Sequence, residues 1–295
     1  MRLVTFQRGG GPQKAGAFLD DNARVVDLAA AGEAAFGADP RLANVLAIVE
    51  GGDAALDKAY EAIKKAPASA IFDLGDVRIL APIQPPPQIR DCLCFELHLK
   101  QAFTAARKLQ AMQSADPAKA MAEIEKTPAP VPAVFYQQPL YYKANRFTVI
   151  GTDQDVEWPN YSKFLDFELE FGAYIKKNAK NVPKEKARDY IFGYTIFNDM
   201  SARDAQVAEM QGQLGPCKGK DFDTGNPMGP CLVTADELKD PYKLTMIARV
   251  NGEEWGRGNS STMYWKSGLA IPPLSHTVVA NSQHETTPVT GRTTP

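Results

Sequence analysis

The sequence predicts an α+β protein rich in β-structure, in which a mixed β-roll follows a small N-terminal α/β domain. Two observations predict this class. Apolar runs of strand length succeed one another after residue 130 with only short helical patterns between them, which favours a roll over a doubly wound sheet. In addition, 44% of the 295 residues are hydrophobic, which is enough for one large core and a small appended domain.

We assign residues 1–80 to the N-terminal domain, 81–87 to a linker and 88–267 to the main domain. The linker contains Pro85-Pro-Pro87, and proline lacks a backbone donor and is disfavoured in helices and central strands. The elements expected in the first domain are strands at 1–6, 17–19 and 25–28, a turn at 20–22, and helices at 42–49 and 54–65.

The main domain is expected to begin with a helical excursion over residues 99–126, which are rich in Ala, Lys, Gln, Met and Glu and are interrupted at Asp116-Pro117. This excursion is either a lid over a site or a passive surface insertion. The elements expected next are strands at 134–136, 148–150, 165–171 and 191–197, a short helix at 183–190, and a hairpin formed by 244–250 and the turn Asn251-Gly252.

Acidic residues stand out in two of these strands. In the run 165–171, Glu168 and Glu170 follow Asp166 at alternate positions, so the three carboxylates should project from one side of a strand. Asp199 ends the next apolar run. Such a pattern is often only a solvated strand face, but clustered carboxylates also form oxygen sites that suit Mg²⁺, Mn²⁺ or Ca²⁺ rather than zinc.

The stretch after Asp199 favours the functional interpretation. Ser201 and Asp204 resemble a capping box, which predicts a helix starting at Ser201. Arg203 and Gln206 would share one face of that helix, and with a nearby lysine they suit an anionic ligand beside a metal. In the alternative reading, Arg203 pairs with Glu209 on the surface and the lysine is an exposed loop residue.

These segments resemble the fumarylacetoacetate hydrolase family. The resemblance runs from Pro85 to Met263 and includes Glu168-x-Glu170, Asn198-Asp-Met-Ser-Ala-Arg-Asp204, Gly219-Lys-Asp-Phe-Asp-Thr224, and an acidic residue seven positions before a histidine. The resemblance implies the following roles: metal ligands Asp91, Glu168, Glu170 and Asp199; general base His98; catalytic donor Lys220; and substrate contacts Arg203, Gln206, Thr224 and Tyr142. It also implies an Mg²⁺, Mn²⁺ or Ca²⁺ cofactor, a small anionic dicarbonyl substrate, a homodimer, and a role in aromatic catabolism.

The chemistry fits those residue types. Hydrolysis of a carbon–carbon bond in a β-diketo acid builds negative charge on oxygen, which a divalent ion and cationic side chains stabilise. Histidine suits water activation because it titrates near neutral pH. His98 is the candidate because His276 and His284 lie in an unusual tail, although a lone histidine is by default structural. Glu96 could orient His98 in an extended segment but not in a helix.

Residues 268–295 depart from the family pattern. The resemblance ends near Trp265, no Pro-Gly-Asp turn follows, and the chain finishes in a Thr/Pro-rich run. We therefore expect this tail to be disordered, as after a truncation or a change of reading frame, and the pocket to lack one wall. The distal acidic partner that the family provides for the histidine would also be lost, which leaves Glu96 as the local substitute.

Two functional hypotheses follow. The first is a metal-dependent hydrolase or lyase of β-diketo or 2-oxo acids, with isomerisation, decarboxylation and hydration as neighbouring reactions. The second is a catalytically impaired relative that still binds metal and serves in binding or assembly.

Composition narrows the remaining choices. The net charge of −2 argues against a nucleic-acid partner, and no apolar run reaches the length needed to cross a membrane. The four cysteines show no disulfide or CxxC pattern, which fits a reducing compartment. With no signal-peptide core at residue 1, we expect a cytoplasmic protein.

Overall fold

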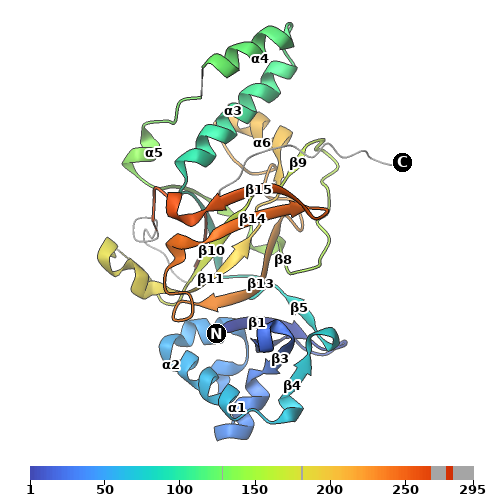
Figure 1. Ribbon diagram of the computed structural model, residues 1–295, viewed down its shortest axis with the longest axis vertical. Helices are drawn as coiled ribbons and strands as arrows, with labels where there is room; N and C mark the ends of the chain where they lie inside the picture. Colours follow the sequence, from blue (N-terminus) through green and yellow to red (C-terminus); the bar gives the residue numbers. More distant parts are fainter. Residues whose placement is uncertain (128, 181, 267–276, 282–295) are drawn as a thin grey trace.

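The computed structural model describes residues 1–127, 129–180, 182–266 and 277–281 (Figure 1). The N-terminal elements are β1 (Arg2–Gln7), β2 (Lys14–Leu19), β3 (Arg24–Asp27), α1 (Leu28–Phe36), α2 (Val45–Lys64), β4 (Ile71–Asp73) and β5 (Arg78–Leu80). The helices of the remaining chain are α3 (Glu96–Met112), α4 (Pro117–Lys126), α5 (Val134–Gln137) and α6 (Arg203–Gln211). Its strands are β6 (Gln88–Leu93), β7 (Leu140–Ala144), β8 (Val149–Ile150), β9 (Leu165–Asp166), β10 (Glu170–Ile175), β11 (Ile191–Phe197), β12 (Ser201–Ala202), β13 (Asn226–Thr234), β14 (Thr245–Val250), β15 (Glu253–Asn259) and β16 (Thr277–Asn281). Short 3-10 helices span Asp20–Asn22, Pro40–Leu42, Ala68–Ala70, Leu74–Asp76, Arg146–Thr148, Lys184–Tyr190, Pro241–Lys243 and Ser260–Thr262.

These elements confirm the α+β class. Within the described part of the chain, a twelve-stranded, largely antiparallel sheet has the main order β4-β3-β2-β1-β13-β11-β10-β16-β6-β7, with β5 paired to β1 and β8 to β13. The sheet is mixed because β16 runs parallel to β6, and β8 runs parallel to β13. Strands β14 and β15 form a separate hairpin, as predicted, and Asn251 and Gly252 both have positive φ at its turn.

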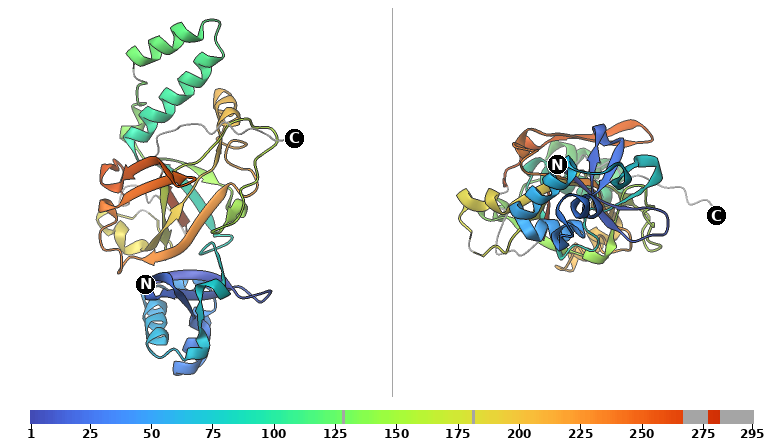
Figure 2. Two further views of the ribbon diagram at one scale, coloured as in Figure 1. Left: turned by 45° about the vertical axis from the view of Figure 1, so that its right-hand side comes forward. Right: turned by 90° about the horizontal axis from the view of Figure 1, so that it is seen from below.

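The N-terminal segment forms a distinct lobe in Figures 1 and 2, yet its sheet continues into the main part of the molecule. β1 pairs with β13, and the opposed residues Leu3 and Leu232 are both fully buried. The 81–87 segment is packed as well, because Thr5 Oγ1 donates to the Pro82 carbonyl at 2.6 Å. The sheet and the linker therefore couple the two parts.

The helical expectations are met in most places. α2 contains non-helical Gly52 with φ of 60°, which separates the two helices predicted at 42–49 and 54–65. α3 and α4 are separate helices because Pro117 starts α4 and the Asp116 carboxylate caps it by accepting from Lys119 N. Together they form a hairpin that projects from the body of the molecule (Figures 1 and 2).

Three local predictions are wrong. Residues 134–136 belong to helix α5 rather than a strand, since they pack as a turn on the aromatic cluster around Phe135. The expected strand over 165–171 is interrupted between β9 and β10. The tail contains β16, whose backbone pairs with β6 and β10, so the expectation of disorder does not hold for residues 277–281. The other tail residues, including His276 and His284, lie outside the described residues.

Trp265, where we expected the family resemblance to end, is an anchored residue. Its indole Nε1 donates to the Phe135 carbonyl at 2.7 Å, and its backbone N–H donates to the Cys94 carbonyl at 3.2 Å. The side chain is 9% exposed and belongs to the core cluster that also contains Cys94. The chain up to this residue is therefore integrated into the fold.

The Leu3–Leu232 contact should make a large contribution to stability. We expect Leu232→Ala to lower the free energy of unfolding by about 2–5 kcal/mol, because truncation of a fully buried leucine loses transfer energy and leaves a cavity. Urea denaturation would measure this change. Leu214→Ala, at a leucine that is 79% exposed, is the control and should change stability by no more than about 0.5 kcal/mol. Equal effects of the two variants would contradict the proposed importance of the β1–β13 junction.

Candidate metal centre and active site

Four carboxylates from distant parts of the chain meet beside the sheet. Asp91 lies in β6, Glu168 precedes β10, Glu170 begins β10 and Asp199 follows β11. One oxygen of each lies within 4.8 Å of the others, and all four residues are buried. β10 pairs directly with β11, and β16 lies between β10 and β6, so the hydrogen bonding of the sheet brings these stretches together.

The cluster holds more acceptors than the chain supplies donors. Among the described residues, Asp91 Oδ1, Asp199 Oδ1 and both carboxylate oxygens of Glu170 are buried and accept no hydrogen bond. Burial, followed by the charges of Asp91 and Glu168, raises the pKa of Glu170 well above its usual range. Buried polar atoms normally have hydrogen-bond partners, and a bound cation would provide these four oxygens with the partner that they lack. The cluster can therefore hold a divalent metal, and its all-oxygen composition suits a hard ion.

Lys220 and Arg203 provide the positive charge around Glu168. Lys220 Nζ lies 2.8 Å from Glu168 Oε1 and 2.6 Å from Asp199 Oδ2, and this lysine is only 4% exposed. The alternative reading of Lys220 as an exposed loop residue is wrong. Burial alone would raise the pKa of Glu168, but Lys220 and then Arg203 hold it well below its usual range. Asp166, which pairs with Arg203, is a fifth buried carboxylate beside the four. The positive charge of Lys220 and Arg203 is therefore smaller than the negative charge that five ionised carboxylates would carry.

Arg203 pairs with Asp166 and Glu168, not with Glu209 as the alternative reading expected. Its Nε donates to Asp166 Oδ2 at 2.8 Å, and its Nη1 donates to Glu168 Oε1 at 2.7 Å. Nη1 also donates to Gln206 Oε1 at 3.1 Å, which confirms that Arg203 and Gln206 share a helix face. Nη2 is buried and has no hydrogen bond with the described residues, although it lies 2.8 Å from Asp166 Oδ2. A buried guanidinium with an unsatisfied donor suits an anionic ligand.

Ser201 has a different role from the predicted helix cap. α6 begins two residues later, and Ser201 lies in the short strand β12. Its Oγ lies 3.2 Å from Glu168 Oε1 and 3.0 Å from the Asp199 carbonyl oxygen. Asp204 does not form the capping box either, because its carboxylate accepts from Ser162 Oγ. The capping pattern therefore predicted the helix but misplaced its start, and it missed the contact of Ser201 with the acidic cluster.

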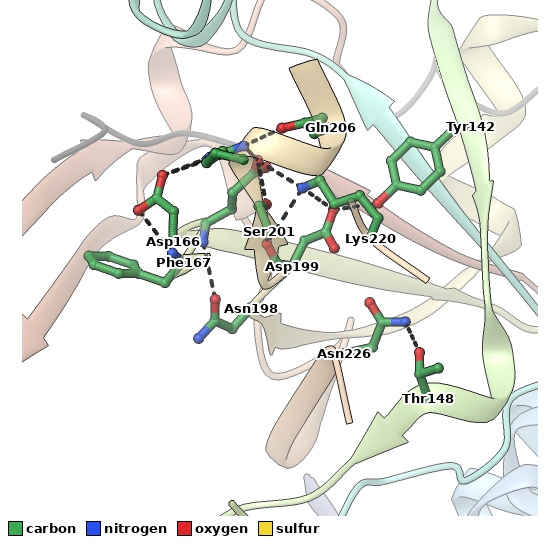
Figure 3. Close-up of polar contacts among 12 residues, drawn as sticks. Tyr142, Thr148, Asp166, Phe167, Asn198, Asp199, Ser201, Gln206, Lys220 and Asn226 are labelled. Atoms are coloured by element: carbon green, nitrogen blue, oxygen red, sulfur yellow. Dashed lines mark hydrogen bonds and ion pairs between the residues drawn. The ribbon is translucent and has the colours of Figure 1, made fainter. Parts of the chain in front are cut away.

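Tyr142 comes to the cluster from β7. It is directly opposite Asp91 in the β6–β7 register, and its hydroxyl donates to Asp199 Oδ2. Figure 3 shows Tyr142 and Lys220 directed at Asp199, with Asp166 on the other side of the group. Burial, and then the charges of Asp199 and Asp91, raise the pKa of Tyr142 well above its usual range. The phenol therefore stays protonated and acts as a hydrogen-bond donor.

His98 reaches the site, whereas Glu96 does not orient it. Both residues lie in the first turn of α3, where side chains two positions apart point in different directions. His98 is 5% exposed and lines a cavity together with Glu168. Glu96 Oε1 instead lies 2.6 Å from Lys100 Nζ. The orienting role predicted for Glu96 is therefore wrong, since it required an extended segment.

A cavity of about 210 Å³ lies beside the acidic cluster, between α3 and α6. His98, Glu168, Arg203 and Gln206 are among its lining residues, so the predicted base and two predicted substrate contacts face one space. The first turns of α3 form one wall, which favours the reading of the helical excursion as a cover over the site. The pocket therefore has a wall from the excursion, as the first of the two alternatives expected.

Of the four predicted substrate contacts, Arg203 and Gln206 line this cavity, whereas Tyr142 and Thr224 do not. Thr224 is held elsewhere by the loop that contains it. Its Oγ1 donates to the Asp223 carbonyl at 2.6 Å and accepts from Glu157 N at 2.7 Å. Its φ of 64° belongs to a tight turn. In this structure the Thr224 hydroxyl stabilises the loop, and it is absent from the described lining of the cavity.

Sequence reasoning missed a residue that holds the Lys220 loop. The Glu209 carboxylate accepts from the backbone N–H groups of Cys217, Lys218 and Gly219 at 2.7–3.1 Å. Gly219 passes so close to α6 that a Cβ there would lie 2.6 Å from Gln206 Cβ. The spacing of Glu209, six positions after Arg203, could have indicated only that it lies on the same helix.

The fold and the site together define a mixed β-roll with a buried carboxylate cluster that can hold a divalent cation. Comparison with known proteins agrees. The profile of the family described as fumarylacetoacetate (FAA) hydrolase C-terminal matches residues 109–281. A protein of Xenopus laevis named oxaloacetate tautomerase fahd2, mitochondrial, is 30% identical over 283 residues, which cover 95% of this chain and 76% of that protein. This chain belongs to the fumarylacetoacetate hydrolase family.

Two further similarities cover different shares of this chain. A putative hydrolase of Burkholderia cenocepacia is 36% identical over 146 residues, which cover 50% of this chain and 49% of the relative. The crystal structure of maleylpyruvate hydrolase from Sphingobium sp. SYK-6 in complex with manganese (II) ion and pyruvate has a TM-score of 0.67 and 18% identity. It covers 98% of this chain and 91% of that chain, which shows a shared fold. The family match continues to residue 281, beyond Met263 and Trp265, where we expected the resemblance to end.

The metal centre predicts opposite effects of one substitution with and without metal. We expect Glu170→Gln to weaken Mn²⁺ binding at least about 10-fold, since even outer-shell partners of metal ligands contribute about 10–100-fold. Without metal, the variant should be more stable by about 1 kcal/mol, because the amide adds a donor among unsatisfied acceptors. Calorimetric Mn²⁺ titration and urea denaturation would measure both effects. The control is Glu254→Gln at an exposed pair with Arg257, and unchanged Mn²⁺ affinity of Glu170→Gln would contradict the assignment.

The three hydrogen bonds that the Glu209 carboxylate accepts predict that this residue protects the Lys220 loop from hydrogen exchange. In Glu209→Ala the backbone amides of Cys217, Lys218 and Gly219 should exchange hydrogen roughly 10-fold faster or more, because bonds to a charged acceptor are lost. Hydrogen exchange read by mass spectrometry or NMR would detect this. Gln211→Ala, at an exposed position of the same helix, should leave the protection unchanged. Unaltered exchange in Glu209→Ala would show that other contacts hold the loop.

Proposed function

We propose that this protein is a metal-dependent enzyme that cleaves a carbon–carbon bond in a small β-diketo or 2-oxo acid, such as an acylpyruvate. One observation supports this proposal above the others: a buried carboxylate cluster with bare oxygens lies next to a cavity lined by a histidine, an arginine and a glutamine. Such a site combines places for a hard cation, an anionic ligand and a proton acceptor.

We propose Mg²⁺ as the ion, with Mn²⁺ and Ca²⁺ as alternatives, and Asp91, Glu168, Glu170 and Asp199 as the residues that would hold it. Carboxylate oxygens suit these hard cations, and the related fold of maleylpyruvate hydrolase carries a manganese ion in its crystal structure. When bound, the cation would polarise carbonyl oxygens of the substrate and stabilise negative charge on them.

The side chains around the cavity have separate roles in this proposal. Arg203 and Gln206, which line the cavity, bind the carboxylate of the substrate. His98 accepts a proton from water as the water oxygen attacks the distal carbonyl carbon. The bond between that carbon and the neighbouring CH₂ then breaks, its electron pair passes to the enolate of pyruvate, and the acyl group leaves as a carboxylic acid. The His98 proton returns to the enolate carbon.

Lys220 is the donor that we place nearest the developing oxyanion. Its ammonium group is buried and lies between Glu168 and Asp199. Burial alone would lower the pKa of Lys220, but the charges of Asp199 and then Glu168 raise it above its usual range. The side chain therefore stays charged during the reaction. A fixed cation in a buried site stabilises transition-state charge more strongly than one in water.

Keto–enol isomerisation of a 2-oxo acid is the second candidate function. The observation that favours it is the 30% identity over 95% of this chain to a protein named oxaloacetate tautomerase. This reaction moves one proton between carbon and oxygen and needs no attacking water. His98 would accept the proton from carbon and return it to the enolate oxygen, while the charged Lys220 stabilises that oxygen. Decarboxylation or hydration of a 2-oxo acid would use the same metal ligands and the same contacts to the substrate carboxylate.

Location and assembly remain predictions. Among the described residues no helix is both long and apolar enough to cross a bilayer. The tautomerase carries the word mitochondrial in its name, so it does not support the cytoplasmic location that we predict. We also propose a homodimer on the basis of the family. The small anionic substrate follows from Arg203 and the metal centre.

His98 and Glu96 allow a matched test of the proposed mechanism. We expect His98→Ala to reduce kcat on acetylpyruvate by about 10²–10⁴-fold, because a general base contributes that much. Glu96→Gln, two residues away on the same helix but paired with Lys100, should retain activity. Both variants should bind Mn²⁺ in calorimetry.

Three outcomes separate the alternatives. Enol–keto conversion of oxaloacetate without cleavage of acylpyruvates would favour the isomerase. Mn²⁺ binding without turnover of either substrate by the wild type would favour the catalytically impaired relative. Full activity of His98→Ala would remove His98 from the mechanism.

A further inference from the structure

The cavity beside the metal centre changes character along the two helices that border it. On α3, His98 in the first turn is followed on the cavity wall by Ala102, Ala105 and Ala106. A rise of about 1.5 Å per residue places the last of these roughly 12 Å along the helix from His98. The polar wall is thus confined to the start of α3.

α6 shows the same change. Arg203 and Gln206 in its first turn face the site, whereas Val207 and Met210 line the cavity further along the helix. Met210 lies about 10 Å along the axis from Arg203. Both helices therefore present polar groups next to the carboxylate cluster and apolar groups away from it.

No cation lies at the apolar end among the described residues that line the cavity. The charged or titratable residues of that lining are His98, Asp166, Glu168 and Arg203, all of which belong to the polar end. The basic residues later in α3 do not line the cavity, and Arg107 Nη1 donates to the Thr127 carbonyl at 2.6 Å. A second carboxylate on a substrate would thus lose hydration beside apolar side chains and gain no cationic partner among these described lining residues, which is unfavourable.

We infer that the substrate is a 2-oxo acid with one carboxylate and an apolar acyl or aryl substituent, which lies between α3 and α6. This inference rests on the proposed function and specifies its substrate class. The cavity of about 210 Å³ exceeds the roughly 150 Å³ of an engineered apolar cavity that binds benzene, so it has room for such a group. Met210 is a specificity-determining residue because it contributes to the apolar end.

The direct test is a matched substrate series on the Mn²⁺-loaded protein. Acetylpyruvate, butanoylpyruvate and hexanoylpyruvate differ only in chain length, and a fourth compound carries the six-carbon chain with a terminal carboxylate. We expect kcat/KM to rise roughly threefold to fourfold for each methylene that becomes buried. The compound with the terminal carboxylate should be no better than acetylpyruvate. A flat series, or a preference for the second carboxylate, would overturn the inference while the proposed function stands.

A binding measurement separates this inference from catalysis. Calorimetry should give a Kd for 2-oxooctanoate at least 10-fold lower than for 2-oxooctanedioate, which differs by its terminal carboxylate. Equal affinities, or tighter binding of the dicarboxylate, would overturn the inference. If no 2-oxo acid binds and no acylpyruvate is turned over, both the proposed function and this inference fail.

A charge substitution provides the matched variant. Met210→Lys introduces a cation at the apolar end, and because Met210 is 53% exposed the lysine can be accommodated without deep burial. We expect the ratio of kcat/KM between hexanoylpyruvate and its terminal-carboxylate counterpart to fall at least 10-fold. Met112→Lys, at a methionine of α3 that is 57% exposed and lies outside the cavity lining, should leave the ratio unchanged. An unchanged ratio in Met210→Lys, with Mn²⁺ binding retained, would exclude Met210 from specificity.

Discussion

The burial of five carboxylates around two cationic side chains is the constraint on which the rest of the site depends. Four of these carboxylates have oxygens within 4.8 Å of one another, and several oxygens accept no hydrogen bond among the described residues. Such an arrangement is unfavourable without further positive charge, and like charges raise the pKa of Asp91 and Glu170 in addition to the effect of burial. The fold must therefore hold these side chains against their mutual repulsion, and a divalent cation would relieve it.

The sheet provides that restraint. β6, β16, β10 and β11 are consecutive neighbours, so the backbone hydrogen bonds that join them also fix the spacing of Asp91, Glu170 and the chain leading to Asp199. β16 comes from the part of the chain that has the least regular sequence, yet its backbone connects the strands of Asp91 and Glu170. Thr277, Val278 and Val279 are β-branched and favour a strand, but which strands β16 joins is decided by backbone hydrogen bonds.

This explains what the sequence could and could not predict. The alternation of Glu168 and Glu170 with apolar residues, and Asp199 at the end of an apolar run, carry local signals that survive in the structure. The break between β9 and β10 and the start of α6 after Ser201 depend on tertiary pairing, which no local pattern contains. The β-branched residues of β16 favour a strand, but its position between β6 and β10 also depends on tertiary pairing. The role proposed for Glu96 was wrong for a related reason. Glu96 could orient His98 only in an extended segment, and both residues belong to α3. Glu209 was missed because its partners are backbone amides, which have no sequence signature.

In the proposed function, α3 and α6 select the substituent of the substrate, and the carboxylate centre held by the sheet binds the oxygens that all such substrates share. The carboxylate cluster, Lys220 and Tyr142 are held by strands and by the loop that Glu209 ties to α6, and they act on the part of a ligand that carries oxygen. α3 and α6 contribute His98, Arg203 and Gln206 from their first turns and apolar residues from the following turns. Because the same two helices supply both kinds of residue, a change in the later turns can alter which substituent fits without moving the groups that bind the carboxylate. In the proposed function the sheet holds most of the carboxylate centre and the later turns of α3 and α6 shape the cavity, while Arg203 and Glu209 of α6 connect the two.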